Sequence, residues 1–446
     1  MTNQKTSMQE KDIESSTNVT EIITDLHTHS KYAGACSENL TFENINQTCI
    51  EKGINLISTG DFTHPLWFKD IKEKLLETKG GIYSLKNQSN GTLFVLGTEV
   101  CTVFDEKGNS KNIFSKAPGI KKVHNCILSP SIEIVEEINS ELSKYGNLSL
   151  DGRPLLNIST PELVEKLMAI NKDIFIFPAH AWTPWFGVFG SISGYDSIKD
   201  AYQDQAKHIY ALETGLSSDP SMNWRVSSND KYALLSGSDA HSPQKLGREA
   251  VVLNLKKDEL SYSKLISSIK SKSISYTIEF FPEEGKYHYD GHRNCNISLN
   301  PTEAKKFNYL CPKCRKKLTL GVLNRVEELA DRDEDYILKG APGYIKAVPL
   351  LEVLSYVYSK GVATKKVYDS YSKLLNTFGT EFNVLIKADI EKIRIIDPEL
   401  SKAIESIRSG NIKIKPGYDG IFGVIDILSR KPEEKKLGKQ SSISDF

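Results

Sequence analysis

Thr24-Asp25-Leu26-His27-Thr28-His29-Ser30 places two histidines one residue apart, directly after the apolar pair Ile22 and Ile23. Side chains alternate along a β-strand, so His27 and His29 point the same way. Two imidazoles on one face, at the carboxyl end of a buried strand, are typical of a metal-binding pair. This stretch alone leaves an alternative open, in which both histidines lie on a solvated face of the strand.

The composition is that of a globular protein with two or three domains. The chain has 446 residues, of which 39% are hydrophobic and 26% are charged. No apolar run approaches the roughly 18 residues of a membrane span, and 1–20 lacks the apolar core of a secretory signal. The odd number of cysteines, seven, favours reduced thiols or metal ligands in the cytoplasm over a disulfide framework. The net charge is zero, so a nucleic-acid partner requires a local basic patch.

Short apolar strands alternate with amphipathic helices between 22 and 282. We expect strands at 54–58, 93–96, 174–177, 209–212 and 233–236, and helices at 42–52, 132–145 and 161–171. Repeated strand–helix units predict an α/β fold with a parallel sheet, open or closed into a barrel. In such barrels the chemistry lies on loops that follow the carboxyl ends of the strands.

Histidines and carboxylates gather at these predicted strand ends. Six of the nine histidines lie there, which favours a shared metal site over isolated surface or core histidines. Mixed imidazole and carboxylate ligands suit transition metals such as zinc, manganese or iron. The residues at the strand ends are His27, His29, Asp61, His64, Glu99, His124, His180, Glu213, Asp239 and His241.

This order of residues resembles the PHP family (polymerase and histidinol phosphatase). The resemblance implies a distorted (β/α)7 barrel that carries two or three divalent metals (Zn, Mn or Mg) and hydrolyses phosphoesters with metal-activated water. Asp239, Glu99 and His241 are then the expected catalytic residues. The chain departs from the family at Ala35, where many members have a further histidine for the third metal. The resemblance assigns the first metal to His27, His29, Glu99 and Asp239, the second to Glu99, His124 and His180, and a third to Asp61, His64 and His241.

Two stretches in the second half of the barrel suit substrate binding. The first, 179–191, is rich in aromatic residues that stack on a nucleobase, and the alternative is a core or structural loop. The second, 213–225, offers hydroxyl, amide and carboxylate groups that read a base edge or hold phosphate; the alternative is a capped turn into a helix. The candidate residues are Trp182, Trp185, Phe186, Ser191, Ser217, Asp219, Asn223 and Arg225.

A cysteine module follows the barrel. His292-x2-Cys295 and Cys311-x2-Cys314 have the spacing of a structural zinc ribbon, with His288 as the alternative to His292. Four protein ligands leave no open position, so we expect one structural zinc. The basic residues beside it predict a contact with a phosphate backbone, or in the alternative a solvated basic turn. These residues are Lys313, Arg315, Lys316 and Lys317.

Beyond Val322 the chain reads as mainly helical, with a glycine-rich turn at 415–423 before a last strand at 424–428. We predict a disordered tail at 1–21, the PHP barrel at 22–282 and the zinc-binding module at 283–330. A C-terminal helical DNA-binding domain at 331–428 and a second disordered tail at 429–446 complete the expected organisation.

The order of these parts is similar to that of the endonuclease Q family over about 22–428. The resemblance implies a DNA-repair endonuclease that flips a deaminated base (uracil, hypoxanthine or xanthine) or recognises an abasic site. It would cut the phosphodiester on the 5′ side and leave a 3′-hydroxyl and a 5′-phosphate. The expected partner is duplex DNA containing a damaged base, in the cytoplasm at the nucleoid; single-stranded DNA and a replication sliding clamp are further candidates. The alternatives are a small-molecule phosphatase like histidinol phosphatase and a non-catalytic DNA-binding subunit.

Overall fold

The computed structural model describes residues 21–88, 91–105 and 119–428. The tails predicted at 1–21 and 429–446 lie outside these ranges, except for Glu21, which begins the first strand. Within the described ranges, no helix is both long and apolar enough to cross a membrane.

A mixed sheet of eleven strands lies at the centre of the described chain. Its strands β1 (Glu21–Asp25), β2 (Leu56–Ser58) and β5 (Leu93–Asp105) run parallel, as the strand–helix repeats predict. By contrast, β6 (Ile120–Ser129) pairs antiparallel with β5, and β8 (Phe175–Pro178) pairs antiparallel with β6. The expectation of a parallel sheet is wrong at these two pairings and at four others in the same sheet that are also antiparallel.

The long strands β5 and β6 change the position of two predicted site residues. Glu99 lies within β5 opposite Cys126, and His124 lies within β6 opposite Cys101, so neither follows a strand end as expected. β5 runs well past the predicted segment 93–96 because 98–103 is rich in the β-branched residues that favour strands.

Two further strands of the barrel lie outside the large sheet and are connected to the segment that follows β1. β9 (Ala211–Glu213) and β10 (Ala233–Leu235) form a parallel pair, and a bridge between Thr28 and Ala240 joins the segment after β10 to the segment after β1. The carboxyl ends of β1, β2, β8, β9 and β10 therefore lie at the same end of the barrel, which we call the mouth. The other strands of the large sheet are β3 (Leu75–Lys79), β4 (Ile82–Leu85), β7 (Leu155–Leu156), β11 (Ala250–Asn254), β12 (Ile274–Glu279) and β15 (Gly343–Lys346).

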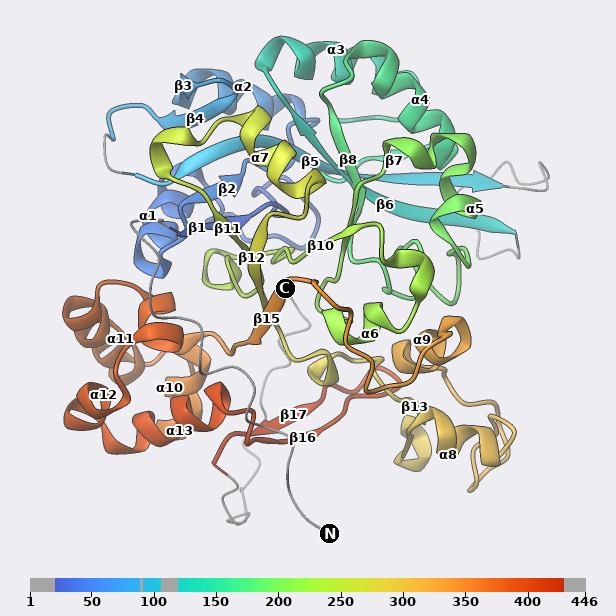
Figure 1. Cartoon of the computed structure of the whole chain (residues 1–446), viewed down its shortest axis with the longest axis vertical. Coiled ribbons are helices and arrows are strands. Elements are labelled where there is room, and N and C mark those ends of the chain that lie inside the picture. The colour runs from blue at the N-terminus through green and yellow to red at the C-terminus, as the bar shows by residue number, and fades with distance from the viewer. Residues whose placement is uncertain (1–20, 89–90, 106–118, 429–446) are drawn as a thin grey trace.

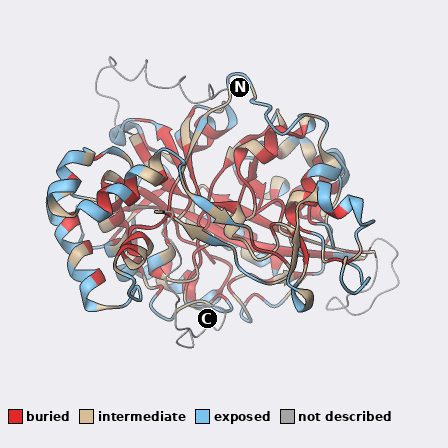
Figure 2. Cartoon of the chain, turned by 90° about the horizontal axis from the view of Figure 1, so that it is seen from below, coloured by how far each residue is buried: buried red, intermediate tan, exposed pale blue. Residues whose placement is uncertain are grey.

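Helices cover the outside of the barrel (Figure 1). The three predicted helices are present, with ends that differ by up to three residues from those expected. Buried residues fill the centre of the molecule, and exposed residues lie mainly on the outer helices (Figure 2). The helices of this part are α1 (Phe42–Lys52), α2 (Pro65–Lys74), α3 (Ile132–Leu142), α4 (Thr160–Ile170), α5 (Ile198–Tyr202), α6 (Pro220–Trp224) and α7 (Tyr262–Lys270).

Two smaller parts follow the barrel, below it in Figure 1. The cysteine module contains β13 (Asp290–His292), β14 (Ile297–Leu299), α8 (Pro301–Lys306) and α9 (Val322–Leu329). The C-terminal part has its own apolar core, built on α10 (Leu350–Tyr358), α11 (Lys365–Phe378), α12 (Ile390–Ile396) and α13 (Pro398–Arg408). A hairpin of β16 (Lys413–Lys415) and β17 (Val424–Asp426) comes last.

β15 connects the cysteine module to the C-terminal helices and pairs in parallel with β12 of the barrel. This segment therefore belongs to the barrel sheet. We propose that the helical domain begins near Leu350 instead of at 331, and we keep the other predicted boundaries as proposals.

A pair of buried carboxyl groups makes the stability of the barrel depend on pH. Burial raises the pKa of Glu279, at the end of β12, to about 8, and it raises the pKa of nearby Glu249 well above its ordinary value. A carboxyl group whose pKa is higher in the folded chain than in the unfolded chain stabilises the fold at low pH. This stabilisation is lost as the pH rises from the unfolded pKa, about 4.3, toward the folded value.

We expect urea denaturation to show a smaller loss of stability between pH 5 and pH 8.5 for Glu279→Gln than for the wild-type chain, because the amide cannot ionise. The exposed substitution Glu137→Gln is the control and should follow the wild-type profile. Identical pH profiles for all three chains would contradict this assignment of the Glu279 proton.

Candidate metal centre

The loop after β1 is held in place by a buried carboxylate. Asp25, the last residue of β1, accepts hydrogen bonds from the backbone N–H groups of Ser238 (3.0 Å) and Gly247 (2.9 Å). The N–H of Asp239 donates to the carbonyl of His27 over 2.9 Å. These bonds join the loop that carries His27 and His29 to the loop that carries Asp239.

Four predicted ligands form the first cluster, and one ligand atom from each lies within 4.8 Å of the others. His29 Nε2 lies 2.9 Å from Asp239 Oδ1 and 3.3 Å from Glu99 Oε2. His27 Nε2 lies 3.6 Å from the same oxygen of Glu99. The first predicted ligand set therefore converges around one point.

Glu99 also belongs to a second cluster, with His124 and His180. Its other oxygen, Oε1, lies 2.5 Å from His124 Nδ1 and 3.0 Å from His180 Nε2. One carboxylate thus offers a separate oxygen to each cluster, which is the arrangement of a ligand that bridges two cations.

The electrostatics of these clusters suit divalent cations. His27 Nε2 and Glu99 Oε2 are buried without a hydrogen-bond partner. Burial alone would raise the pKa of Glu99, but the nearby imidazoles of His124 and His27, with hydrogen bonds from His124 and His180, hold it well below its usual range. Burial likewise opposes ionisation of Asp239, yet the hydrogen bond from His29 and nearby imidazoles keep its pKa well below normal. Burial lowers the pKa of His124, so this imidazole is neutral and able to act as a ligand.

Three predicted ligands at the same mouth have a strained backbone. Asp61, His180 and Asp239 have φ angles of 47°, 30° and 45°. Left-handed conformations in residues other than glycine cost on the order of 1–3 kcal/mol and are retained where the surrounding structure fixes them. Three of the nine predicted ligands lie in such positions, as expected of a site shaped for chemistry.

The three residues predicted for a third metal do not form a comparable group within the described ranges. Asp61 accepts a hydrogen bond from His29 Nδ1 (2.9 Å) and another from the N–H of Ser30 (2.6 Å), so it orients a ligand of the first cluster. The His64 ring stacks on Tyr32 with centroids 4.4 Å apart. His241 Nδ1 donates to the carbonyl of Asp239 over 2.8 Å. The third metal stays a prediction.

Comparison with curated proteins gives two relatives. Over 259 residues the chain is 34% identical to the uncharacterized protein MJ0043 of Methanocaldococcus jannaschii, a match that covers 57% of this chain and 32% of that protein. The chain thus spans about a third of the length of this relative. Over 426 residues it is 28% identical to the uncharacterized protein YqxK of Bacillus subtilis, covering 91% of this chain and 99% of YqxK. The family model of the MJ0043 C-terminal domain matches residues 349–411.

Solved structures give a likeness over most of the chain. The crystal structure of the lesion-specific endonuclease PfuEndoQ from Pyrococcus furiosus has a TM-score of 0.79 and 32% identity, covering 92% of this chain and 98% of that one. The chain belongs to the endonuclease Q family. A complex of Endonuclease Q with a 27-mer duplex, with an abasic lesion at the active site, matches equally well: TM-score 0.79, 32% identity, 93% of this chain and 100% of that one. The match confirms the predicted PHP-type barrel with appended domains.

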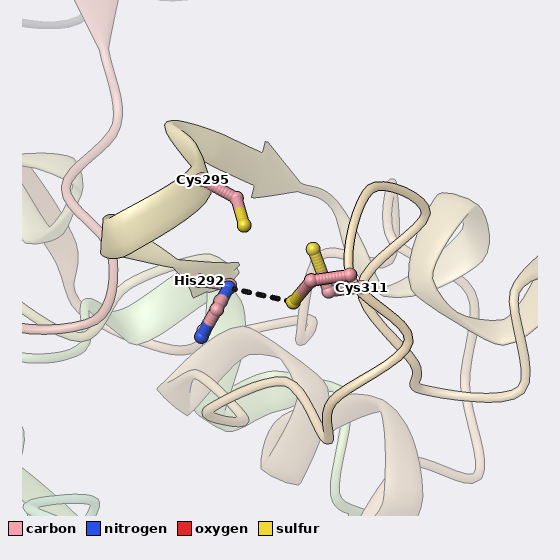
Figure 3. Close-up of side chains that lie close together, drawn as sticks. His292, Cys295 and Cys311 are labelled. Atoms are coloured by element: carbon pink, nitrogen blue, oxygen red, sulfur yellow. Dashed lines mark hydrogen bonds between the residues drawn. The ribbon is translucent and has the colours of Figure 1, made fainter.

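The cysteine module of this endonuclease Q chain brings its four predicted ligands together. His292, Cys295, Cys311 and Cys314 form one group, in which His292 Nδ1 lies 3.4 Å from Cys314 Sγ (Figure 3). His288, the predicted alternative, is buried against Tyr289 and lies outside this group. The backbone N–H groups of Cys314 and Lys313 outweigh burial and lower the pKa of Cys311 to about 6, which favours the thiolate that a zinc site requires.

The basic residues predicted to contact DNA lie on the surface of this module. Lys313 Nζ donates to the carbonyl of Cys295 over 2.9 Å, which holds this lysine against the candidate zinc site. The exposed side chains are Lys313, Arg315, Lys316 and Lys317.

Half of the predicted substrate residues have structural partners. Trp182 is 1% exposed and its Nε1 donates to Asn223 Oδ1 over 2.8 Å. Asp219 pairs with Lys346 at 2.9 Å and caps α6, and Arg225 pairs with Glu327 at 2.9 Å. These contacts give Trp182, Asn223, Asp219 and Arg225 structural roles that require no substrate. The other four, Trp185, Phe186, Ser191 and Ser217, are partly or fully exposed and stay candidates.

Sequence reasoning did not name two residues at the metal centre as metal ligands or catalytic residues. Glu213 ends β9, and its carboxylate accepts from His27 Nδ1 (2.9 Å) and from the N–H of His180 (2.6 Å), so it connects both clusters. The position of Glu213 at the end of a strand is the sequence signal that could have identified it. Arg153 Nε lies 3.9 Å from Glu99 Oε2. This arginine follows Gly152 in a turn between elements, and no spacing pattern identifies it.

We expect Glu213→Gln to weaken divalent-metal binding by about 10–100-fold, the usual cost of losing an outer partner of a histidine ligand. The amide no longer stabilises the tautomer and orientation of His27. Calorimetric titration of the metal-free chain with Mn²⁺ would measure the effect. Glu279→Gln, another buried carboxyl outside both clusters, is the control. Equal affinities for both variants would contradict a positioning role for Glu213.

Proposed function

We propose that this chain is a metal-dependent DNA-repair endonuclease that cuts the phosphodiester backbone beside a damaged base. The observation that carries this proposal is the bridging position of Glu99 between two ligand clusters, on a fold shared with a lesion-specific endonuclease over 92% of the chain. The proposed substrates are duplexes with uracil, hypoxanthine, xanthine or an abasic site. The proposed cut lies 5′ to the lesion and leaves a 3′-hydroxyl and a 5′-phosphate.

His27, His29 and Asp239 would hold one cation, His124 and His180 a second, and Glu99 both. Divalent cations (Zn, Mn or Mg) would supply a lowered pKa for water and stabilisation of negative charge on phosphate oxygens. Among the chain's own groups, Arg153 is suited to bind a phosphate oxygen, because its guanidinium lies at the mouth beside Glu99.

His241 is suited to move a proton. Its Nδ1 donates to the carbonyl of Asp239, which leaves Nε2 as the acceptor. Burial lowers the pKa of His241, so the ring is neutral and able to take a proton at Nε2 near neutral pH. We propose His241 as the group that accepts a proton during hydrolysis.

The proposed DNA partner suits the distribution of basic side chains. Exposed Lys313, Arg315, Lys316 and Lys317 would contact the phosphate backbone and hold the duplex against the mouth. Single-stranded DNA is a second proposed substrate. A sliding-clamp partner, location at the nucleoid and a DNA-binding role for the helical domain stay predictions from sequence.

Labelled duplexes with one uracil, one hypoxanthine, one abasic site or only normal bases test the function, with Mn²⁺ or Mg²⁺ present. We expect cutting 5′ to each lesion and an intact normal duplex. Equal cutting of all four would overturn lesion specificity. Turnover of a free phosphomonoester without DNA cleavage would favour the small-molecule phosphatase, and neither activity would favour the DNA-binding subunit.

A further inference from the structure

A row of aromatic side chains leads from the second ligand cluster to the C-terminal hairpin. The Phe186 ring stacks on His124 with centroids 4.5 Å apart. Its neighbour Trp185 contacts Tyr287, in the segment before the cysteine module, at 5.1 Å. Lys286 Nζ then lies 4.5 Å from the ring centroid of Phe422 in the turn between β16 and β17. We refer to Phe186, Trp185, Tyr287 and Phe422 as the ring path.

The scaffold beneath the ring path is closely packed at its barrel end. Trp185 lies in a compact loop whose backbone leaves no space at Gly187, where an added Cβ would come 2.5 Å from the carbonyl oxygen of Ala181. The carbonyl of Trp185 also accepts a hydrogen bond from the Ser193 hydroxyl.

The other end, the glycine-rich turn, is fixed to the segment before the cysteine module. The N–H of Gly417 donates to Glu283 over 2.8 Å, and that of Gly420 donates to Lys286 over 3.0 Å. Asp419 accepts from the N–H of Arg293 (2.7 Å) and from Thr319 Oγ1 (2.6 Å). The backbone that carries each end of the ring path is therefore held in place by these contacts.

The outer rings of the path face solvent despite this rigid support. Trp185 is 38% exposed, Phe422 is 51% exposed, and Ile421 beside it is 38% exposed. Lys286 and the exposed Arg293 add positive charge along the same row. Rigid aromatic surfaces with cations between them match a nucleic-acid strand, whose bases stack on rings while its phosphates meet positive charge.

We propose that the ring path binds an unpaired DNA strand beside the cleavage site. Bases stack on Trp185 and Phe422, and Lys286 and Arg293 contact the phosphates. A fully paired duplex hides its base faces, so the ring path recognises the locally opened strand. This proposal rests on the proposed function, because continuity with the His124 cluster is what places the strand next to the reacting phosphate.

Fluorescence anisotropy with undamaged 12-nucleotide single strands and 12-base-pair duplexes tests the ring path, in a Glu99→Gln background that does not cut. Stacking on one ring is worth about 1–3 kcal/mol per base, so Trp185→Ala and Phe422→Ala should each weaken single-strand binding by about 5- to 150-fold. Trp185→Phe should retain most of the affinity. Duplex binding should change by less than about twofold, because backbone contacts carry it.

Tyr210→Ala is the matched control. Tyr210 is 37% exposed and has Lys270 Nζ 4.6 Å from its ring, but it lies at the amino end of β9, opposite the mouth. Unchanged single-strand affinity in Trp185→Ala and Phe422→Ala would overturn the proposal, as would an equal loss for strand and duplex. If the wild-type chain cuts no lesion yet shows the expected strand binding, the proposed function fails and the ring path stands.

Discussion

Glu99→Gln will lower the single-turnover rate of cleavage of a uracil-containing duplex by a factor on the order of 10³ or more. The two oxygens of Glu99 face different clusters, Oε2 toward His29 at 3.3 Å and Oε1 toward His180 at 3.0 Å. An amide presents one oxygen and one N–H₂ group, so it cannot serve two cations. We expect bound Mn per chain, measured by mass spectrometry after dialysis, to fall together with the rate.

Glu249→Gln is the matched control for this substitution. Glu249 is as deeply buried as Glu99, but burial raises its pKa well above the ordinary value, so its carboxyl is already neutral. The control should retain wild-type cleavage and metal content. A Glu99→Gln chain that cuts within tenfold of the wild-type rate would contradict the bridging role.

We expect Cys311→Ser to lose the zinc predicted for the cysteine module and to unfold this module. The apolar core of this module is small, with Ala304, Cys311 and Leu318 as its buried members within the described ranges. A structural zinc site supplies about 10–16 kcal/mol in small zinc peptides, more than such a core provides. We expect one zinc fewer per chain, rapid tryptic cleavage within 293–320, and DNA affinity lowered by at least about tenfold through loss of the basic surface.

Cys49→Ser separates zinc loss from a general cost of replacing a buried thiol. Cys49 and Cys311 are both 0% exposed, but Cys49 lies in α1 and packs in the barrel core. It should keep its zinc, its resistance to trypsin and its DNA affinity. Full zinc content in Cys311→Ser would remove this cysteine from the predicted ligand set.

Strand-end spacing singled out most of the histidines and carboxylates at the mouth, but it did not predict which of them form a cluster or what each one does. The two-residue period of a strand places His27 and His29 on one side, and the following loops supply Asp239. Asp61 and Glu213 follow the same pattern, yet their oxygens bond to His29 and His27 on the side away from the cluster centre. The direction of a carboxylate depends on loop backbone that periodicity does not describe.

The aromatic residues of 179–191 differ in burial, and this difference separates those with a structural role from those that stay candidates for substrate binding. Trp182 and Trp185 are three residues apart and chemically alike, but one is buried against Asn223 and the other is exposed beside Tyr287. The ring path joins side chains more than two hundred residues apart in the sequence, such as Trp185 and Phe422. Such contacts arise from the packing of separate parts of the chain, which local patterns do not record.

Anomalous diffraction from crystals grown with Mn²⁺ tests the central claim, that Glu99 joins two cation sites at one mouth of the barrel. We predict two manganese peaks that share Glu99, one beside His27, His29 and Asp239 and one beside His124 and His180. Data at the zinc edge should show a further peak among His292, Cys295, Cys311 and Cys314. If crystals grown with saturating Mn²⁺ show no manganese peak beside Glu99, the metal-dependent mechanism is contradicted.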